Sequence, residues 1–498
     1  MRILLSWARK QSDPDTRILI ERLEKGSHSF VYFVGAPIDE KSTPAGAVFH
    51  SYADAEIGKN AHGIDATRFP PLDEELIRKL YHTESIVLTM FNRFFDALCV
   101  DERRRIYYEM VRYWMGILSV YTPEVVLFPT LPHFGYDYIL YALAQLFNIK
   151  TIFFDDTRFP GRLLLATSLE QLTEPLVRVL EEHKGKTCTV QELASDIREY
   201  YEPRSRRDFN AVPSYIADQK ARHSFWKIRF PWKSMWQSVR DFSFLQKAPR
   251  YLRAVASERA VPFLTRIAIH LSYPGVSDLR KEYEAQEKPT DFGRPFIYFP
   301  LQKQPERTTS PQGDMFVDQL LALEIVSGAL LPGQVIYVKE HPLQWLHFGV
   351  RFSSSRYRGY YARIARIKNV VLVPLATDSY RLINESTAVS AVTGSAGFEA
   401  VLRGKPAVVF GKVWYENCPG IFKASSKEEC ENAFALITRG YTVDQQSVIH
   451  YLKCFESVTI PAFIAPTARK ASHISNEACM HAISDAILTH LINAPSLV

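Results

Sequence analysis

Short apolar runs repeatedly end at polar side chains between Phe296 and Gly411. The run FIYFP leads into the loop LQKQPERTTSPQGD, QVIYVKEHP ends in His-Pro, and VSAVTG opens into SAGFEAVLRGKPAVVFG. Segments with helical patterns separate these runs, which predicts βαβ units and a parallel sheet. Ligands bind outside the carboxyl ends of the strands in such sheets. The polar groups at these ends therefore predict one shared site for an anionic nucleotide.

The N-terminal third of the chain shows the same alternation. Strand-like runs are RILLSW, FVYFVG, VVLFP and KTIFF, and helical patterns cover residues 73–121 and the segment DYILYALAQLF. A chain of 498 residues exceeds what one hydrophobic core usually supports. We therefore expect an α/β protein with two Rossmann-like domains, at residues 1–202 and 291–430. Residues 203–290 would form a basic, tryptophan-rich insert or linker, and residues 431–498 a tail of helices.

The cysteines and the N-terminus bear on the compartment. The six cysteines are scattered, with no CxxC pair and no metal-ligand spacing, which argues against zinc sites and disulfide frameworks. The segment MRILLSWARK acquires charge too soon for a signal peptide and is better interpreted as a first strand. No uninterrupted apolar run is long enough to span a bilayer. We expect a cytoplasmic protein.

Positive charge is concentrated in the middle of the chain. Residues 204–266 contain 14 lysines and arginines against four acidic residues, an excess of +10, and tryptophans are interleaved with them. Cationic residues attract anionic headgroups and tryptophans favour the membrane interface, so residues 220–240 are a candidate contact with the inner membrane face. Alternatively, the aromatic residues form a small satellite core under a solvated face. Nucleic acid is not an expected partner, because no recognised motif supports it.

The segment TGSAGFEA, residues 393–400, places small residues at a strand-to-helix turn. Glycine permits close backbone approach, and the start of a helix presents unpaired N–H groups that suit a phosphate. The acidic residue one turn into the helix can accept from ribose hydroxyls, or the serine can simply cap the helix. The predicted donor-binding residues here are Gly394, Ser395, Ala396, Gly397 and Glu399.

Two further strand ends carry candidate donor-binding residues. Lys339 and His341 lie two residues apart, on one face of an extended strand. His341 can donate to a phosphate or, as an imidazolium, offset charge that develops on a leaving group. In the loop after FIYFP, Gln302 and Gln304 can contact a base or sugar hydroxyls.

An acidic pair ends a strand in the N-terminal half, within TIFFDDTRFPGR. Adjacent carboxylates repel each other, which raises the pKa of one and suits it to proton transfer, and a carboxylate can also attack an anomeric carbon. Asp155 and Asp156 point in opposite directions if the strand continues through them, so one would face the site. Alternatively, an aspartate caps a helix beside Arg158. The acceptor-side candidates are Arg158 with His133 and Tyr136 from the loop PTLPHFGYD.

The motifs YFPLQKQPERTTSPQGD, YVKEHP and VTGSAGFEAVLRGKPAVVFG together resemble those of the bacterial capsule polysaccharide biosynthesis proteins, over about residues 295–412. That family includes transferases that move 3-deoxy-manno-octulosonic acid (Kdo) from its CMP conjugate. The resemblance implies that Asp156, or else Asp155, is the catalytic acid. It also implies that His341 with Pro342 holds the donor's cytidylate and that Ser395 lies at its phosphate.

Two Rossmann-like domains around an insert describe the GT-B architecture of glycosyltransferases, although architecture alone does not determine the reaction. We expect a glycosyltransferase of surface polysaccharide assembly that moves Kdo or a related ulosonic acid from a CMP-sugar to a glycan or glycolipid acceptor. The C-terminal domain would bind the donor, and the N-terminal domain would bind the acceptor and supply the carboxylate. No cofactor or metal is expected, since His341, Lys339 and helix N-termini can stabilise the departing phosphate. The alternatives are a sugar-nucleotide epimerase-like enzyme and a non-catalytic capsule assembly or export factor.

Overall fold

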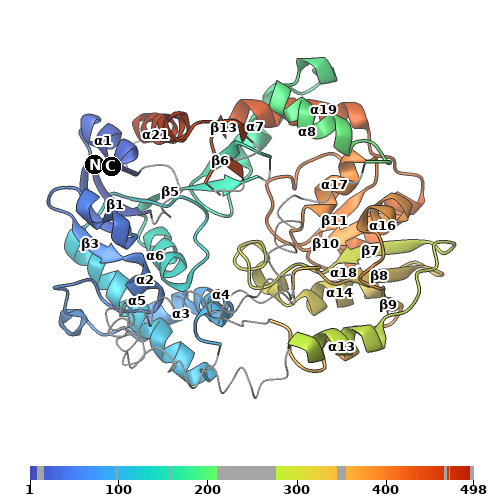
Figure 1. Cartoon of the computed structure of the whole chain (residues 1–498), viewed down its shortest axis with the longest axis horizontal. Coiled ribbons are helices and arrows are strands. Elements are labelled where there is room, and N and C mark those ends of the chain that lie inside the picture. The colour runs from blue at the N-terminus through green and yellow to red at the C-terminus, as the bar shows by residue number, and fades with distance from the viewer. Residues whose placement is uncertain are drawn as a thin grey trace, which may run out of the picture.

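The computed structural model describes residues 1–7, 16–96, 98–157, 159–209, 276–344, 355–464, 468–469 and 472–493. The candidate membrane contact at residues 220–240 and the candidate Arg158 lie outside these described residues. Figure 1 shows two α/β units, one formed by the first part of the chain and one by the later part.

The N-terminal domain is built on a seven-stranded sheet with the order β13-β6-β5-β4-β1-β2-β3. Strands β1 to β5 are parallel, and β6 is antiparallel to both of its neighbours. The order 3-2-1-4-5 has its topological switch between β1 and β4, as in Rossmann-like sheets. The strands are β1 (Arg2–Ser6), β2 (Ser29–Gly35), β3 (Val48–Ser51), β4 (Val125–Leu127), β5 (Lys150–Asp156), β6 (Arg162–Ala166) and β13 (Thr459–Pro461).

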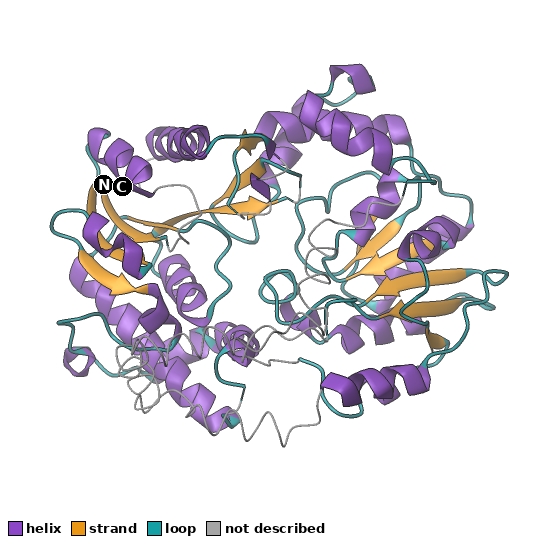
Figure 2. Cartoon of the chain, viewed as in Figure 1, coloured by secondary structure: helices purple, strands orange, loops and turns teal. Residues whose placement is uncertain are grey.

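Helices cover both faces of this sheet (Figure 2). The region predicted as one helical stretch at residues 73–121 is interrupted. Asp73 caps α3 (Glu74–Lys79), and α5 (Val100–Tyr121) begins only after Cys99. The Cys99 backbone N–H donates to the Glu102 carboxylate. The helices are α1 (Thr16–Lys25), α2 (Tyr52–Glu56), α3 (Glu74–Lys79), α4 (Tyr81–Met90), α5 (Val100–Tyr121), α6 (Gly135–Leu146), α7 (Glu174–Glu182) and α8 (Ser195–Arg204), with short 3₁₀ turns at Pro37–Ser42, Ala66–Arg68, Phe91–Arg93 and Val190–Glu192.

The C-terminal domain contains a fully parallel six-stranded sheet with the order β12-β11-β10-β7-β8-β9. Numbered from its own first strand, this is the order 6-5-4-1-2-3 of a doubly wound sheet, with the switch between β7 and β10. The predicted pair of Rossmann-like domains is therefore confirmed. The strands are β7 (Phe296–Pro300), β8 (Val335–Lys339), β9 (Val370–Leu372), β10 (Ala388–Ala391), β11 (Ala407–Val409) and β12 (Ile421–Lys423).

The helices of the C-terminal domain enclose two cores, one on each face of the sheet. Helices α13, α14, α15 and α18 contribute to one core, and α16 and α17 lie over the other. Their bounds are α13 (Val276–Gln286), α14 (Gln319–Gly328), α15 (Tyr360–Arg366), α16 (Ser379–Glu385), α17 (Ala396–Leu402) and α18 (Lys427–Thr438), and a 3₁₀ turn at Asp314–Val317 precedes α14.

The tail of the chain is helical, as predicted, and returns to the N-terminal domain (Figure 1). Helix α19 (Gln445–Val458) leads into β13, which pairs with β6, and α21 (Asn476–Asn493) packs on α1 through an Arg22–Asp485 ion pair. Ala462 N–H donates to the Gly161 carbonyl oxygen at 3.0 Å. Gly161 has φ +75°, and a Cβ there would lie 2.6 Å from the Ser472 Cβ. The tail therefore completes the first sheet, a pairing that the sequence pattern did not predict.

A cluster of aromatic side chains joins the two domains. Phe159, from the turn between β5 and β6, is 2% exposed. Its ring centroid lies 5.9 Å from that of Phe398 in α17, 5.6 Å from Trp414 and 5.1 Å from Phe455 in α19. Aromatic contacts at these separations add to the gain from burial. The ring of Phe159 thus connects the first sheet, the second sheet and the tail.

Replacing Phe159 with alanine should lower the free energy of unfolding by about 3–5 kcal/mol, because it empties a fully packed interdomain position. Urea denaturation followed by tryptophan fluorescence measures the change. Phe147→Ala is the matched control, since Phe147 is 44% exposed and its loss should cost little. Equal effects of the two substitutions would contradict the interdomain role.

Candidate functional site

The carboxyl ends of the two sheets meet at Arg307, in the loop that follows β7. Its guanidinium forms a 2.9 Å ion pair with the carboxylate of Asp155 at the end of β5. It also donates to the Thr130 hydroxyl after β4 at 2.9 Å and to the Asp156 carbonyl oxygen at 3.2 Å. Only 11% of the Arg307 side chain is exposed. A single loop of the C-terminal domain therefore contacts the ends of two N-terminal strands.

Asp155 and Asp156 lie on opposite faces of the first sheet, because β5 continues through both. Asp155 shares its face with Phe153, in the core that extends from α4–α6 into the C-terminal domain. Asp156 shares its face with Phe154, in the core beneath α1 and α21. The Asp155 side chain is buried and paired with Arg307, whereas Asp156 is partly exposed. The two adjacent carboxylates therefore occupy different environments.

Charged and titratable groups after β4 surround the same junction. His133 donates through Nδ1 to the carbonyl oxygen two residues earlier at 2.9 Å. Its pKa is lowered well below the usual value by burial and by the charges of Arg93 and Arg307, so the ring is neutral at pH 7. Asp137 is buried at the start of α6, and burial raises its pKa to about 8 although backbone N–H groups and Arg93 oppose the rise. This carboxyl group is therefore able to carry a proton near neutral pH.

His341 lies in the turn that follows β8. Its Nδ1 accepts from the Leu343 N–H at 3.2 Å, which leaves Nε2 to carry the proton of the neutral ring. Burial lowers the pKa of His341 to about 4, although the nearby carboxylates of Glu306 and Glu340 oppose the shift. At neutral pH the ring is uncharged. Of the two roles predicted for His341, donation by a neutral ring is the one that its charge state allows.

Gln302 and Gln304 take part in a buried network of hydrogen bonds. The Thr393 hydroxyl after β10 lies 2.9 Å from the side-chain amide of Gln302. The amide oxygen of Gln304 accepts from Gln319 at 2.9 Å and from Arg356. Both glutamines are 7% exposed. In this structure they bind the loops to each other, at the point where β7, β8 and β10 end.

The remaining candidates for the donor site also have protein partners. Lys339 donates to the Ser379 hydroxyl at 2.8 Å and to the Thr377 carbonyl oxygen. Ser395 is exposed, and its hydroxyl donates to Glu399 at 2.9 Å. Burial raises the pKa of Glu399, and the hydrogen bond from Ser395 opposes the rise. Lys339 and Ser395 thus lie at the ends of strands that flank β7 on either side.

The small residues at the start of α17 permit close packing. A Cβ at Gly394 would lie 3.1 Å from Gln302 Nε2, and one at Gly397 would lie 3.3 Å from the Tyr415 hydroxyl. Ala396 is partly exposed, and Pro342 is exposed in the turn after β8. A larger side chain at Gly394 would therefore displace the loop that carries Gln302.

The predicted residues are not all brought to one point. The loops with Gln302, His341 and Ser395 follow neighbouring strands in the order β10-β7-β8, at the switch of the second sheet. The acid pair lies across the junction and is connected to them through Arg307. Tyr136 is 3% exposed inside the N-terminal domain, with its hydroxyl 3.4 Å from that of Ser6 at the end of β1.

Sequence reasoning did not identify four charged residues of this region: Arg93, Asp137, Arg307 and Arg356. Asp137 has a recognisable signal, because an acid at the third position of a helix accepts the backbone N–H before it, here that of Phe134 at 2.7 Å. The arginines pair with residues from distant parts of the chain, so no local pattern marks them.

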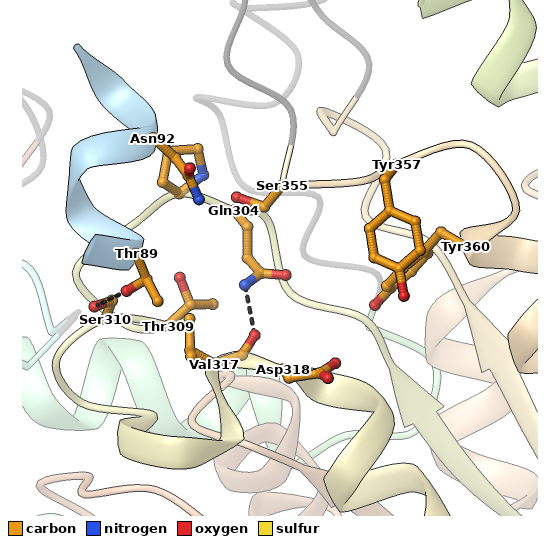
Figure 3. Close-up of a pocket in the computed structure, with 11 residues that line it drawn as sticks. Thr89, Asn92, Gln304, Thr309, Ser310, Val317, Asp318, Ser355, Tyr357 and Tyr360 are labelled. Carbon is orange, nitrogen blue, oxygen red and sulfur yellow. Dashed lines mark hydrogen bonds between the residues drawn. The ribbon is translucent and has the colours of Figure 1, made fainter. Parts of the chain in front are cut away.

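A cavity of about 190 Å³ opens between the two domains beside the 304–310 loop (Figure 3). Its lining includes Thr89 and Asn92 from the N-terminal domain. The Thr89 hydroxyl lies 2.8 Å from that of Ser310, which closes one end of the cavity. Tyr357 and Tyr360 lie on the opposite side, across from Gln304. The cavity is therefore formed by both domains.

Two kinds of structural feature are absent from the described residues. No group of three or more His, Cys, Asp or Glu side chains is arranged to hold a metal ion in the described ranges. No described helix combines the length and the apolarity that crossing a bilayer requires. The six cysteines are free thiols, and only Cys99 is exposed.

Comparison with a family model confirms the resemblance that the motifs predicted. Residues 237–436 match the family described as "Capsule polysaccharide biosynthesis protein". This range contains β7 to β12 and the loops that carry Gln302, His341 and Ser395. No curated protein matches the sequence significantly.

Several solved structures align over most of the chain at low similarity. The KpsC β-Kdo 2,4 transferase of Thermosulfurimonas dismutans is 14% identical and aligns over 66% of this chain and 87% of its own, with a TM-score of 0.25. The UDP-GlcNAc 2-epimerase of Neisseria meningitidis is 10% identical over 99% and 100%, with a TM-score of 0.23. The calicheamicin glycosyltransferase CalG4 is 11% identical over 99% of each chain, with a TM-score of 0.23. TM-scores of this size establish no common fold, so the architecture rests on the strand order above.

The lowered pKa of His341 makes a prediction about stability and pH. The unfolded state takes up the proton at about pH 6.5 and the folded state only near pH 4, so stability falls as the pH is lowered through this window. His341→Gln should reduce this fall by about 1 kcal/mol per pH unit. Urea denaturation of both proteins between pH 7 and 4.5 measures it, and parallel curves would contradict the burial of a neutral imidazole.

Proposed function

We propose, from the family match of residues 237–436, that this protein is a glycosyltransferase of capsular or other surface polysaccharide assembly. It transfers Kdo or a related ulosonic acid from a CMP-sugar to a glycan or glycolipid acceptor. The observation that carries the proposal is the meeting of the two sheets at Arg307, which connects the loop after β7 with Asp155 and Asp156. This contact brings the loop after β7 to the Asp155 carboxylate and to the backbone of Asp156.

The donor binds at the carboxyl ends of β10, β7 and β8, at the switch of the second sheet. Its phosphate lies at the start of α17, near Gly394 and Ser395, where the small residues permit close backbone approach. Neutral His341 donates through Nε2 to the cytidylate, with Pro342 fixing the turn that carries it. Arg307 and Arg93 supply positive charge at the junction, which suits a donor that carries a carboxylate and a phosphate.

Asp156 is the proposed reacting carboxylate, because Asp155 is buried and ion-paired with Arg307. As a nucleophile, it attacks the anomeric carbon while the bond to the CMP oxygen breaks and CMP departs. An acceptor hydroxyl then attacks the same carbon, the bond to Asp156 breaks, and the hydroxyl proton passes to the freed carboxylate, which gives a product with the donor's configuration. As a base, Asp156 instead takes the proton of the acceptor hydroxyl during one direct displacement, and the configuration is inverted.

Replacing the reacting carboxylate should abolish most of the transfer. Asp156→Asn should lower the rate of CMP release from CMP-Kdo, measured with a panel of oligosaccharide and glycolipid acceptors, by about 10²–10⁴-fold. Asp485→Asn, at a 60% exposed side chain on α21, is the matched control. Retained activity in Asp156→Asn together with loss in Asp155→Asn would reassign the reacting group to Asp155. Mass spectrometry of the donor-treated protein tests for a glycosylated peptide and so distinguishes nucleophile from base.

The transfer should not require a metal ion. Because protein donors at the start of α17 and at His341 are proposed to hold the phosphate, excess EDTA should leave the rate of CMP release unchanged. Loss of activity in EDTA with recovery on addition of Mg²⁺ or Mn²⁺ would refute this part of the mechanism. Incubation with the donor alone provides a further check, since an isomerised nucleotide sugar would indicate an epimerase-like reaction.

A further inference from the structure

Arg93 is a cation of the junction that pairs with an aromatic ring and not with a carboxylate. It ends the 3₁₀ turn Phe91–Arg93 after α4, and its guanidinium carbon lies 4.9 Å from the centroid of the Phe134 ring. Within the described part of the chain, none of its contacts is a hydrogen bond or an ion pair. A guanidinium presents five N–H donors in a planar fork. The donors of Arg93 therefore have no acceptor among the described residues.

The carboxylates nearest to Arg93 are engaged elsewhere. Burial lowers the pKa of Arg93, and the charges of nearby carboxylates, first Asp137 and then Glu306, oppose the shift. Asp137 accepts from the Phe134 N–H at 2.7 Å, and Glu306 forms a 3.2 Å ion pair with Lys303. A charge that is partly removed from water is costly unless a hydrogen-bonded partner offsets the loss. Arg93 is partly exposed, so an incoming anion has access to it.

The second arginine of the junction is already paired. Arg307 forms its ion pair with Asp155 at 2.9 Å and donates to the Asp156 carbonyl oxygen at 3.2 Å. Burial lowers the pKa of His133, and the charges of Arg93 and Arg307 lower it further, so both arginines lie near this ring. Of the two cations, Arg93 is the one whose donors have no described acceptor.

Glu306 links Arg93 to the donor side of the boundary. Burial lowers the pKa of both Arg93 and His341, and the charge of Glu306 opposes the shift in each. Because the interaction between charges weakens with distance, one carboxylate that acts on both groups lies near both. Arg93 belongs to the N-terminal domain, and His341 lies in the turn after β8. A ligand that extends from His341 past Glu306 therefore reaches Arg93.

The ligand group that fits these donors is a carboxylate. A guanidinium binds a carboxylate through two parallel charge-assisted hydrogen bonds. The phosphate of the donor is already assigned to the start of α17, which leaves the carboxylate of an ulosonic acid as the second anionic group. In such a sugar the carboxylate is bonded directly to the anomeric carbon. A residue that holds the carboxylate therefore also positions the carbon that reacts.

We propose that Arg93 binds the carboxylate of the donor sugar and so selects an acidic sugar over a neutral one. The inference rests on the proposed function and deepens it, because it assigns the choice of sugar class to one side chain. The Phe134 ring holds the plane of the guanidinium, and the bound carboxylate holds the anomeric carbon for Asp156.

Ligand-observed NMR titration of the full chain tests binding without any transfer reaction. The probes are the methyl glycoside of Kdo and its carboxyl-reduced form, in which an alcohol replaces the carboxylate. The unchanged protein should bind the acid at least about tenfold more tightly than the alcohol. Arg93→Gln should weaken binding of the acid about 10–100-fold and bind the two glycosides alike. Arg105→Gln, at a 73% exposed side chain on α5, is the matched control and should bind both as the unchanged protein does.

Arg93→Lys separates recognition from folding. It keeps a cation over the Phe134 ring, so its melting temperature should stay unchanged. Its affinity for the acid should fall about three- to tenfold, because an ammonium group cannot donate two parallel bonds. The proposal is overturned if the unchanged protein binds acid and alcohol equally, if Arg93→Gln still prefers the acid, or if Arg93→Lys loses thermal stability and keeps its affinity.

The kinetics of CMP release show which substrate carries the carboxylate. Arg93→Gln should raise the KM for CMP-Kdo by about tenfold or more and leave the KM for the acceptor unchanged. A higher KM for an acidic acceptor alone would overturn the assignment to the donor. Arg93-dependent binding of the acid by a protein that releases no CMP would leave the role of Arg93 standing while the proposed transfer reaction fell. Full CMP release by Arg93→Gln would overturn the role of Arg93 and leave the transfer reaction standing.

Discussion

The buried ion pair between Arg356 and Glu340 holds together the loops that follow β7 and β8. Neither side chain has exposed surface, and two hydrogen bonds of 2.8 and 3.2 Å join them. The same guanidinium donates to the Gln302 carbonyl oxygen at 3.0 Å and to the Gln304 side chain, and the Tyr361 hydroxyl donates to Glu340 at 2.7 Å. Removal of one partner leaves an uncompensated buried charge, which typically costs about 3–5 kcal/mol. The pair therefore fixes the loops after β7 and β8 as one unit.

That unit reaches two separate places on the domain boundary. Through Gln302 it contacts Thr393 at the end of β10, where the small residues of α17 begin. Through the stacking of Arg356 on Tyr360 it forms the far wall of the cavity. Networks of buried hydrogen bonds are rigid when every member is paired. The shape of the cavity and the position of the loops after β7 and β8 are therefore determined by the same side chains.

The strand ends were predictable, and their partners were not. FIYFP and VIYVK are uniform apolar runs bounded by turn residues, so β7 and β8 lie where the pattern indicated. The pairing of β6 with β13 was not predicted. β13 is only three residues long, lies in the C-terminal tail and pairs with a strand far earlier in the sequence. Asp155 and Asp156 were identified from their position at a strand end. Arg307, whose sequence position lies 151 residues from Asp156, could be assigned to them only in three dimensions.

The distribution of charge separates the boundary between the domains into two regions. Arg93 and Arg307 lie close enough to His133 to lower its pKa, and His133 and His341 are both neutral at pH 7. The positive charges beside the acid pair are therefore those of arginines, which remain charged at any physiological pH. Across the 304–310 loop, Asp318 is the one charged residue among the described residues that line the cavity. The two regions therefore differ in charge: ion-paired arginine and aspartate side chains lie at the junction, and one carboxylate lies in the described lining of the cavity.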